Sequence, residues 1–573
     1  MKLGANGRNW NGLMLKRTVG MVIVCACVVA PLTAAMPDWA ELPRMYVETQ
    51  YPPPVLSRTV LTVGDTGTYS CTELQSAIDD ASPGDEISID PTCRISLRAG
   101  KSLILRNKVP TNAYIIIRTA LLSHLPEGEQ VGPANAMDMA HIIKQGVEAA
   151  LVTEPGAHHY RLVGLEITAD PSNRMMDNLV ELGDGSRLQS QISQVPHHII
   201  IDRSYIHGMS NLNLQRCVAL NSASSAILDS YISDAHYEGR DSQAIDGWNG
   251  PGPFKIVNNY LEAAGENVMF GGADPAIANL VPSDVEFRRN LVAKNKAWQG
   301  SSWTVKNLLE LKNAQRVWID GNVFQYNWAQ AQSGTAIVLT PRDQSGTCPW
   351  CVVQDVIFTN NIVRHSAGGF AILGHDNNHI SQQAQRITIH NNLLIDIGTP
   401  QWGPTDRFLI LLGGTPNTPG PSYVTFDHNT VLGPATMYVG ERYLHSTMPY
   451  FSFTNNIVQS ALTGGGSADG DSTFITYFTS GFHFSNNVLV NQPSRNYVQY
   501  HENFFPLTLP QVGFTNPTAG DYSLRRTSPY RTKASDGGAV GYLSNDATAS
   551  RFPPLAQSAK HLRLSGPGIR DPI

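Results

Sequence analysis

Short runs of alternating apolar and polar residues fill most of the chain. The stretch FKIVNNYLEAAGENVMFGG, Phe254 to Gly272, contains short apolar runs, an Asn pair after the first run and two glycines at its end. Alternation of this kind between Asn and Gly positions is typical of half-buried strands. The composition agrees, because 49 Gly, 36 Pro and only 15% charged residues suit many short strands joined by turns better than long surface helices.

One pattern, apolar-x-apolar-x-x-(Asn or Ser)-x-apolar, recurs along the chain. Its Asn or Ser falls at Ser204, Ser230, Asn259, Asn290, Asn322, Asn361, Asn392, Asn429, Asn456 and Asn487. These positions span 283 residues in nine intervals, so the repeat is about 31 residues long, which is typical of solenoids. Each repeat holds short strands that would pair with their copies one coil away, about 4.8 Å apart. We therefore predict an all-β chain folded as a parallel β-helix of about ten or more coils.

The Asn column itself has a structural explanation. Asn tolerates left-handed backbone at a corner, and its amide can bond the next Asn along the stack. We therefore interpret Asn259, in the stretch quoted above, as a structural residue.

The two ends of the repeat region differ from its middle. The segment CTELQSAIDDASPGDEISI predicts an amphipathic helix that ends at Pro83-Gly84 and would cover the open end of the solenoid. The segment GDYSLRRTSPYRTKASDGGAVG is expected to form the closing coil. The predicted organisation is a signal peptide (1–35), an N-terminal extension (36–67), the β-helix (68–545) and a C-terminal tail (546–573).

The N-terminus has the features of an export signal. Two basic residues precede the apolar run VGMVIVCACVVAPLTAA, and small residues favour cleavage after Ala35. A membrane anchor is less favoured, because the run is short and Pro37 follows it. A lipoprotein at Cys27 is a weaker alternative, and Met14 is an alternative start. We expect a secreted chain, extracellular or periplasmic, with no membrane span after cleavage.

The net charge of the chain limits the kinds of molecule that it is expected to bind. The formal net charge is −6, and removal of residues 1–35 takes away four basic residues and no acid, which leaves −10. A globally acidic chain argues against nucleic acid as the partner. It allows an acidic polysaccharide, because a local basic site or a bridging cation can bind one. We expect a monomer that binds polysaccharide.

The cysteines predict two disulfides. Cys71 and Cys93 flank the predicted helix and the strand after it, and we expect them to pair in an oxidising compartment. Cys348 and Cys351 in CPWC have redox spacing, but a loop-closing disulfide is favoured because no βαβ context surrounds them. Cys217 is left over and is expected to be buried.

The helix followed by PGDEI, together with the stacked NN corners, resembles the pectin-lyase-like right-handed β-helix superfamily. Residues 68–545 are similar to secreted bacterial right-handed β-helix proteins that lack an assigned activity. The resemblance implies a single-stranded right-handed parallel β-helix with an N-terminal capping helix. It constrains function loosely, because the superfamily includes polysaccharide lyases, hydrolases, epimerases and non-catalytic phage or adhesin fibres.

Two short segments resemble parts of particular lyases in this superfamily. VWID at 317–320 resembles the calcium-aspartate strand of pectate lyases, but Gly321 stands in place of the family's His and the Arg-rich segment is missing, which puts a pectate lyase in doubt. GENV at 265–268 is similar to the GE strand of alginate and chondroitin lyases, over four residues only.

Stacking the strand that follows each corner gives an apolar, inward column. Its members are Leu220, Ile245, Phe270, Leu311, Leu339, Leu373 and Leu411. The charges beside it gather on the coils in the middle of the chain. Glu266 is expected beside Asp241 one coil below, where a Ca²⁺ ion would offset the repulsion between the two carboxylates, with Asp246 as a candidate further ligand. The alternative, which we favour, is an ion-pair network with Arg216 and Lys306.

The same alignment predicts a cleft. Glu310 and Lys312 flank the inward Leu311 and should lie on one face. Gly271 and Gly272 leave a gap between Asp246 and Lys312 that matches an extended sugar chain.

The residues at this cleft suggest a lyase that cleaves a uronate-containing glycan by β-elimination. The expected catalytic residues are Lys312, as a base of lowered pKa, with Glu310 and Arg342. The expected substrate-binding residues are Asn221, Asp246, Lys306, Trp248 and His375, and the expected metal ligands are Asp241 and Glu266. A non-catalytic carbohydrate-binding protein and a glycoside hydrolase that uses the same carboxylates remain the alternatives.

Overall fold

The structure is a computed structural model. It describes residues 39–52, 58–109, 111–404, 407–415, 418–440, 446–460, 462–464 and 468–543. The chain divides into two compact units, residues 1–37 and 38–573, and all described residues belong to the second. The predicted signal peptide and the predicted tail lie outside the described residues. Among the described helices, none is long and apolar enough to cross a membrane.

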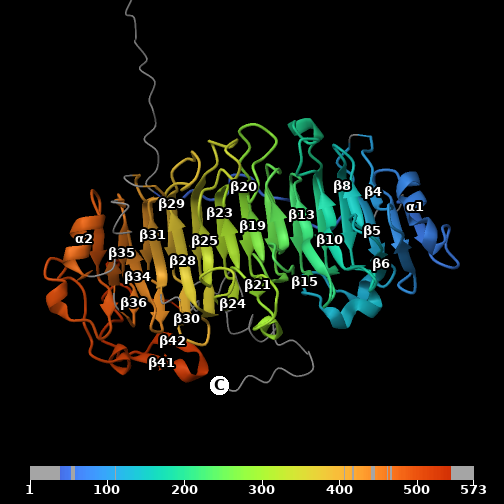
Figure 1. The fold of residues 1–573 in the computed structure, drawn as a ribbon. Coiled ribbons are helices and arrows are strands. Elements are labelled where there is room, and N and C mark those ends of the chain that lie inside the picture. The colour runs from blue at the N-terminus through green and yellow to red at the C-terminus, as the bar shows by residue number, and fades with distance from the viewer. Residues whose placement is uncertain are drawn as a thin grey trace, which may run out of the picture. The chain divides into compact units, whose positions relative to one another are not determined.

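Three long parallel sheets form the second unit (Figure 1). The first sheet contains β1 (Val60–Val63), β2 (Glu86–Ile89), β5 (Ile115–Thr119), β8 (His158–Val163), β11 (His197–Asp202), β14 (Ser225–Leu228), β17 (Phe254–Val257), β20 (Ser283–Arg288), β23 (Ala314–Asp320), β26 (Val353–Thr359), β29 (Gln385–His390), β32 (Ser422–Asp427), β35 (Ser452–Thr454) and β39 (His483–Ser485). The second sheet contains β3 (Arg94–Leu97), β6 (Ala140–Lys144), β9 (Leu165–Ala169), β12 (Tyr205–His207), β15 (Tyr231–Ala235), β18 (Tyr260–Ala263), β21 (Leu291–Ala293), β24 (Val323–Asn327), β27 (Ile362–Ser366), β30 (Leu393–Ile397), β33 (Thr430–Leu432), β36 (Ile457–Val458) and β40 (Val488–Leu489). The third sheet contains β4 (Leu103–Leu105), β7 (Leu151–Thr153), β10 (Met175–Leu182), β13 (Asn213–Leu220), β16 (Gln243–Gly247), β19 (Val268–Phe270), β22 (Leu309–Leu311), β25 (Thr335–Leu339), β28 (Gly368–Leu373), β31 (Arg407–Leu412), β34 (Thr436–Val439), β37 (Leu462–Gly464) and β38 (Ala468–Asp469).

Apart from β38, which pairs antiparallel with β37, each strand pairs in parallel with the corresponding strand one coil away, and successive strands along the chain pass from the first sheet to the second and then the third. This arrangement is the predicted right-handed parallel β-helix. A single apolar core runs inside the three sheets. Phenylalanines stack within it from coil to coil, as in Phe426, Phe453 and Phe484, whose neighbouring ring centroids are 5.2 and 5.6 Å apart. The fold prediction is therefore confirmed.

The Asn column forms a continuous hydrogen-bonded ladder between the first and second sheets. At Asn322, the side-chain oxygen accepts bonds of 2.8 and 3.0 Å from the backbone and side chain of Asn290. The side-chain nitrogen donates to Phe287 O at 3.0 Å and to Asn361 Oδ1 at 2.9 Å. The left-handed residue is the one before each Asn, as at Asn258 with φ of 59° before the buried Asn259. The ladder is thus confirmed, but the corner conformation belongs to its neighbour.

The N-terminal end of the core is covered by a helix. A short 3₁₀ turn (Cys71–Glu73) leads into α1 (Leu74–Asp80), which buries Leu74, Ala77 and Ile78 against the core. The disulfide between Cys71 and Cys93 ties this turn to the segment before β3, as predicted. Because β1 already pairs with β2, the β-helix begins before residue 68, within the segment assigned from sequence to the N-terminal extension.

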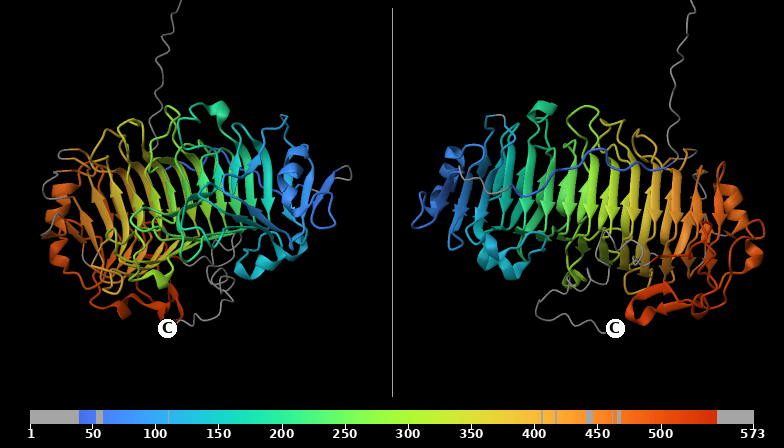
Figure 2. Two further views of the ribbon diagram at one scale, coloured as in Figure 1. Left: turned by 45° about the vertical axis from the view of Figure 1, so that its right-hand side comes forward. Right: turned by 180° about the vertical axis from the view of Figure 1, so that it is seen from behind.

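A described part of the N-terminal extension, residues 39–52, crosses several coils of the first sheet. Its backbone nitrogens at Glu41 and Arg44 donate to Asp355 at 3.2 Å and Asp284 at 2.9 Å. Further along, Arg161 on β8 donates to Thr49 O at 2.8 Å. Figure 2 shows this blue segment lying across the strands in its right-hand view. We call residues 39–52 the strap.

The C-terminal end departs from the prediction. After α2 (Asp471–Tyr477), residues 514–524 form an antiparallel pair, β41 (Phe514–Asn516) and β42 (Asp521–Leu524), instead of a closing coil. This segment buries apolar residues against Ile457 and Val488 of the second sheet. The remaining short 3₁₀ helices are η2 (Leu122–His124), η3 (Pro133–Asp138), η4 (Ile192–Gln194), η5 (Lys296–Trp298), η6 (Ser494–Asn496), η7 (Leu509–Val512) and η8 (Pro517–Ala519).

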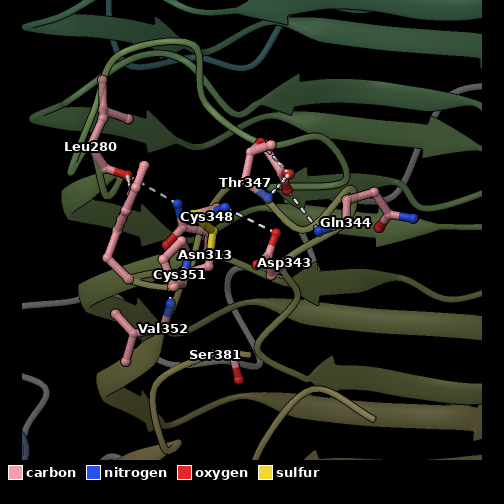
Figure 3. Close-up of a disulfide and its surroundings, with 12 residues drawn as sticks. Leu280, Asn313, Asp343, Gln344, Thr347, Cys348, Cys351, Val352 and Ser381 are labelled. Carbon is pink, nitrogen blue, oxygen red and sulfur yellow. Dashed lines mark hydrogen bonds between the residues drawn. A yellow bond between two sulfur atoms is a disulfide. The ribbon is translucent and has the colours of Figure 1, made fainter. Parts of the chain in front are cut away.

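The second predicted disulfide closes the loop between β25 and β26 (Figure 3). Both Cys348 and Cys351 are buried. The backbone of Cys348 donates to the Asp343 carboxylate at 2.9 Å, and that of Val352 donates to Asn313 Oδ1 at 3.2 Å. Burial and these loop contacts favour the loop-closing interpretation over a redox role. Among the described cysteines, Cys217 is buried and forms no disulfide.

Candidate functional site on the third sheet

The candidate site is the outward face of β13, β16, β19 and β22 with the loops beside them. We call it the charged strip, and its members are Arg216, Asp241, Gln243, Asp246, Trp248, Glu266, Lys306, Asn307, Glu310 and Lys312. Glu310 and Lys312 lie on one face as predicted, on either side of the fully buried Leu311. Their Oε1 and Nζ atoms are 3.6 Å apart.

The strand register differs from the predicted one at β16. Ile245 pairs with Val218 and Val268, whereas the sequence alignment had placed it beside Leu220 and Phe270. Asp246 therefore pairs with Met269, which pairs with Glu310 one coil further.

The alignment was also shifted at β28. There Ile372, rather than Leu373, pairs with Leu339 and Leu411. The predicted column is correct from Phe270 through Leu311 to Leu339.

The acids expected to hold calcium are bridged by a lysine. Lys306 Nζ lies 2.5 Å from Asp241 Oδ1 and 3.3 Å from Glu266 Oε1. Asp241 precedes β16 and Glu266 precedes β19, so the two carboxylates are not strand partners; Gln243 instead donates to Glu266 at 2.7 Å. The arrangement fits an ammonium ion, and it is the alternative ion-pair network of the sequence analysis. Calcium at this position stays a prediction.

Burial sets the protonation of the strip's inner carboxyls. Burial raises the pKa of Glu266 to about 7, with repulsion from Glu310 and Asp241 adding to it and attraction to the two lysines opposing it. Burial also raises the pKa of Asp246 to about 6, although the guanidinium of Arg216 works against the shift. Both acids therefore change charge near neutral pH.

The pKa values of the two lysines are raised, whereas the sequence analysis predicts a lowered pKa for Lys312 as the base. Burial alone lowers the pKa of Lys312, but Glu310, Glu266 and Asp241 outweigh it, so its pKa lies above the ordinary value. The pKa of Lys306 is raised in the same way, burial being outweighed chiefly by Glu266 and Asp241. The expectation that neighbours lower the pKa of Lys312 is therefore not met, and both side chains carry a stable positive charge.

Exposure decides which of these groups can touch a ligand. The side chains of Asp241, Lys306 and Lys312 are 35%, 17% and 14% exposed. Those of Glu310 and Glu266 are 5% and 0% exposed. A ligand on the strip would therefore meet the Asp241 carboxylate, two ammonium ions and the edge of Glu310, with Glu266 beneath them.

A pocket of about 410 Å³ opens at one end of the strip, over β10 and β13. It is lined by Asp177, Asn178, Glu181, Gly183, Asp184, Gly185, Ser186, Gln215, Arg216, Ala219, Asn221, Arg240 and Trp248. Arg216 lies over the Trp248 ring, 4.8 Å from its centroid, and donates to Asp246 at 2.8 Å. Asn221 is buried and accepts from the backbone of Trp248 at 3.0 Å, so it positions that residue. A half-buried indole beside polar groups is suited to stacking on a sugar ring.

Several buried oxygens of the charged strip have no hydrogen-bond donor. They are Gln243 Oε1, Asp246 Oδ1, Glu266 Oε1 and Asn307 Oδ1. Glu266 Oε1 does approach Lys306, but outside hydrogen-bond geometry. Buried polar atoms in folded proteins are nearly always paired, so this concentration of unpaired oxygens distinguishes the interior of the strip from the Asn ladder.

Two predicted site residues lie apart from the strip's centre. Arg342 donates to Asp376 at 2.9 Å and to Asn377, so its guanidinium is engaged, although its backbone bonds Lys312 O at 2.9 Å. His375 is half-buried in the loop after β28, and burial lowers its pKa. Their catalytic and binding roles stay predictions.

The sequence alignment missed the neutral members of the strip. Gln243 and Asn307 contact Glu266 and Glu310 directly, at 2.7 and 3.0 Å. Both residues stand in or beside the aligned strands, so a search for amides as well as charges would have found them. Glu181 and Arg240, which line the pocket, belong to segments that had not been aligned.

Comparisons with known proteins find solved structures of low sequence identity to this chain. No family model and no curated protein matches the sequence. Among solved structures, a mannuronic acid specific polysaccharide family 6 lyase from human gut microbiota is 12% identical, with TM-score 0.44, over 79% of this chain and 93% of that one. A mutant tailspike protein of E. coli bacteriophage HK620 is 10% identical, with TM-score 0.44, over 80% of this chain and 79% of that one. Pectate lyase Pel9A is 10% identical, with TM-score 0.35, over 85% of this chain and 98% of that one.

Proposed function

We propose that the charged strip binds an acidic polysaccharide and cleaves it by β-elimination next to a uronate. The observation that carries the proposal is the pair of partly exposed ammonium groups of Lys306 and Lys312. Neighbouring carboxyl groups raise the pKa of both lysines and so keep them charged. Such cations can pair with a sugar carboxylate and stabilise the charge that develops on it when the adjacent carbon loses its proton.

The roles follow from exposure and contact. Lys312 and Lys306 neutralise the uronate carboxylate. The carboxylate of Glu310, which is fixed by Asn307 at 3.0 Å and faces Lys312, accepts the proton from the carbon next to that carboxylate. The C–O bond on the following carbon then breaks, water or an acid protonates the leaving oxygen, and an unsaturated sugar remains. The described disulfides suit the secreted setting expected for such an enzyme.

Hydrolysis is a second candidate, and the pocket supports it. Asp177, Glu181 and Asp184 line the same cavity as Trp248. A glycosidase needs two carboxyl groups across the scissile bond, one of them protonated at working pH. These acids, with Asp246 beside them, could fill both places without using the lysines.

The test uses the secreted chain with a panel of polyuronates and neutral glycans, in Ca²⁺ and in EDTA. Ultraviolet absorbance reports the unsaturated product, and reducing ends report any cleavage. Lys312→Gln is compared with Lys101→Gln, a matched change at an exposed lysine near the N-terminal end. We expect Lys312→Gln to slow the rise in absorbance at least about a hundredfold and Lys101→Gln to leave it unchanged. Lys312→Gln removes a positive charge that would stabilise the negative charge developing on the uronate in the transition state.

Each outcome separates the candidates. Reducing ends without absorbance would replace elimination by hydrolysis and move attention to the pocket carboxylates. Binding without either signal would make the chain a carbohydrate-binding protein. Loss of activity in EDTA, restored by Ca²⁺, would establish a cation requirement that the lysine bridge alone does not explain.

A further inference from the structure

Two adjacent strands of the first sheet begin with a histidine pair. His158 and His159 open β8, and His197 and His198 open β11. The register pairs His197 with His158. The charged strip lies on the third sheet, so the proposed glycan chemistry uses none of these side chains.

The backbone brings the two rings of each pair together. His159 and His198 have left-handed φ values of 58° and 55°, which interrupt the usual alternation of side chains along a strand. The two Nδ1 atoms are 2.9 Å apart in the first pair and 2.7 Å apart in the second. Such a conformation is uncommon for residues other than glycine, but it recurs near the start of later strands of the first sheet, as at Asp284, Arg316 and Asp355, so the fold itself supplies it.

Between the coils, the rings lie face to face. His158 and His197 have centroids 5.1 Å apart and planes 10° apart, and His159 and His198 have centroids 4.5 Å apart and planes 6° apart. Stacking of like residues is usual in a solenoid and accounts for these two contacts. Inside each pair the two Nδ1 atoms share one N–H···N hydrogen bond, in which one ring donates and the other accepts, and an ion bound to both nitrogens would replace that hydrogen bond.

The ring nitrogens of the two pairs lie within a small volume. Ligand atoms of His159, His197 and His198 all lie within 4.8 Å of one another, and His158 Nδ1 adjoins that of His159. Unprotonated imidazole is the form that binds metals.

We propose that His158, His159, His197 and His198 form a binding site for a divalent transition-metal ion of the Zn²⁺ or Cu²⁺ class. Neutral imidazole is a preferred ligand of these ions. Zn–N bonds of about 2.0–2.1 Å in tetrahedral geometry put ligand nitrogens about 3.4 Å apart, so the Nδ1 pairs, now 2.9 and 2.7 Å apart, would open by about 0.5 and 0.7 Å. The ion would join two neighbouring coils. His197 and His198 are half-buried, which leaves it a route in from solvent.

Another histidine cluster provides the matched control. His390 and His428 both direct Nδ1 at the Asp427 carboxylate, at 3.0 and 2.8 Å. Hydrogen bonds to that shared acid explain this arrangement without a metal. The two clusters thus differ in the partner of their ring nitrogens, which is a carboxylate in the control cluster and another imidazole in the proposed site.

The experiment titrates the full chain, stripped with EDTA, with Zn²⁺ by calorimetry and with Co²⁺ by visible absorption. We expect about one equivalent bound, with a cobalt spectrum typical of nitrogen ligands. The double variant His159→Gln/His198→Gln should lose at least about a hundredfold in affinity, because even outer-shell changes at metal sites cost about ten- to a hundredfold. The control His390→Gln/His428→Gln should bind as the wild type does.

Three outcomes would overturn the site. The wild type binds no stoichiometric ion, the double variant keeps its affinity, or only the control variant loses it. Circular dichroism and melting of the metal-free proteins check folding. If the double variant does not fold, the single change His198→Gln, at a half-buried ring, replaces it under the same criteria.

Discussion

The Asn ladder and the charged strip are both columns of buried polar side chains on successive coils, and they differ in how their polar atoms are paired. Each Asn of the ladder bonds the next, as Asn290, Asn322 and Asn361 show. The strip instead keeps oxygens without donors on Gln243, Asp246, Glu266 and Asn307. The same stacking of coils thus gives a column of mutually hydrogen-bonded amides in the Asn ladder. In the charged strip it gives a column of charged side chains in which several buried oxygens lack a donor.

The reason lies in the side chains. An amide has both donors and acceptors, so identical amides one coil apart satisfy each other. Acids are acceptors and lysines are donors, so the strip depends on which residue each coil happens to supply. A column whose polar atoms satisfy one another contributes to stability, whereas the strip presents to a ligand its lysines, Asp241 and the edge of Glu310.

The largest effect is expected from breaking the ladder. Asn322→Ala removes four side-chain hydrogen bonds at a fully buried position and leaves its partners unpaired. We expect a loss of about 3–5 kcal/mol of unfolding free energy, measured by chemical denaturation. The exposed Asn378→Ala should change it by less than about 0.5 kcal/mol. Equal effects of the two changes would mean that the hydrogen bonds of the Asn ladder do not contribute to stability as proposed.

The next effect concerns Glu266 and pH. Its pKa is about 7 when folded against an ordinary value near 4.5. Between these values the folded chain holds a proton that the unfolded chain has released, so this residue makes stability fall as pH rises from about 4.5 to 7. Glu266→Gln should remove on the order of 2 kcal/mol of that fall. Melting curves at pH 5 and pH 8 test it, and identical pH dependence in both proteins would contradict it.

A smaller effect is expected for Trp248. Trp248→Ala should weaken glycan binding about tenfold, or about 1.4 kcal/mol, by removing the aromatic wall of the pocket. Trp318, with Arg288 3.9 Å from its ring centroid on the first sheet, provides a matched control. Affinity electrophoresis with the best substrate of the panel compares the two variants. A loss confined to Trp318→Ala would place binding on the other sheet.

The smallest effect is expected for Asp246→Asn at pH 5. The pKa of Asp246 is about 6, so it is mostly protonated there and an amide replaces a neutral group. Stability should therefore change by less than about 1 kcal/mol, as measured by chemical denaturation at pH 5. A stability loss as large as that of Asn322→Ala would instead assign Asp246 a structural role like that of the ladder.

The sequence was sufficient for the elements that repeat. The Asn at each corner, the helix before PGDEI and both disulfides follow from spacing and residue type, because each depends on local chemistry or on strict periodicity. The left-handed residue before each Asn was assigned one position late, since Asn itself often adopts that conformation.

The site was harder to predict because register is a three-dimensional property. At β16 the alignment slipped by two residues, which preserves the inward and outward alternation and so leaves no trace in the pattern. At β28 the neighbouring Ala371, Ile372 and Leu373 are all apolar, so a slip of one was equally invisible. The sequence analysis includes an ion-pair network with Lys306, but the exact bridge from Asp241 to Glu266 depends on loops whose path the alternation does not encode.

The strap has a consequence for how the fold would come apart. In a solenoid each coil contacts only the next, so unfolding can begin at an end and proceed coil by coil. Residues 39–52 bond β26, β20 and β8, which lie many coils apart. One peptide segment therefore couples distant coils directly, and their loss becomes a concerted event rather than a gradual fraying.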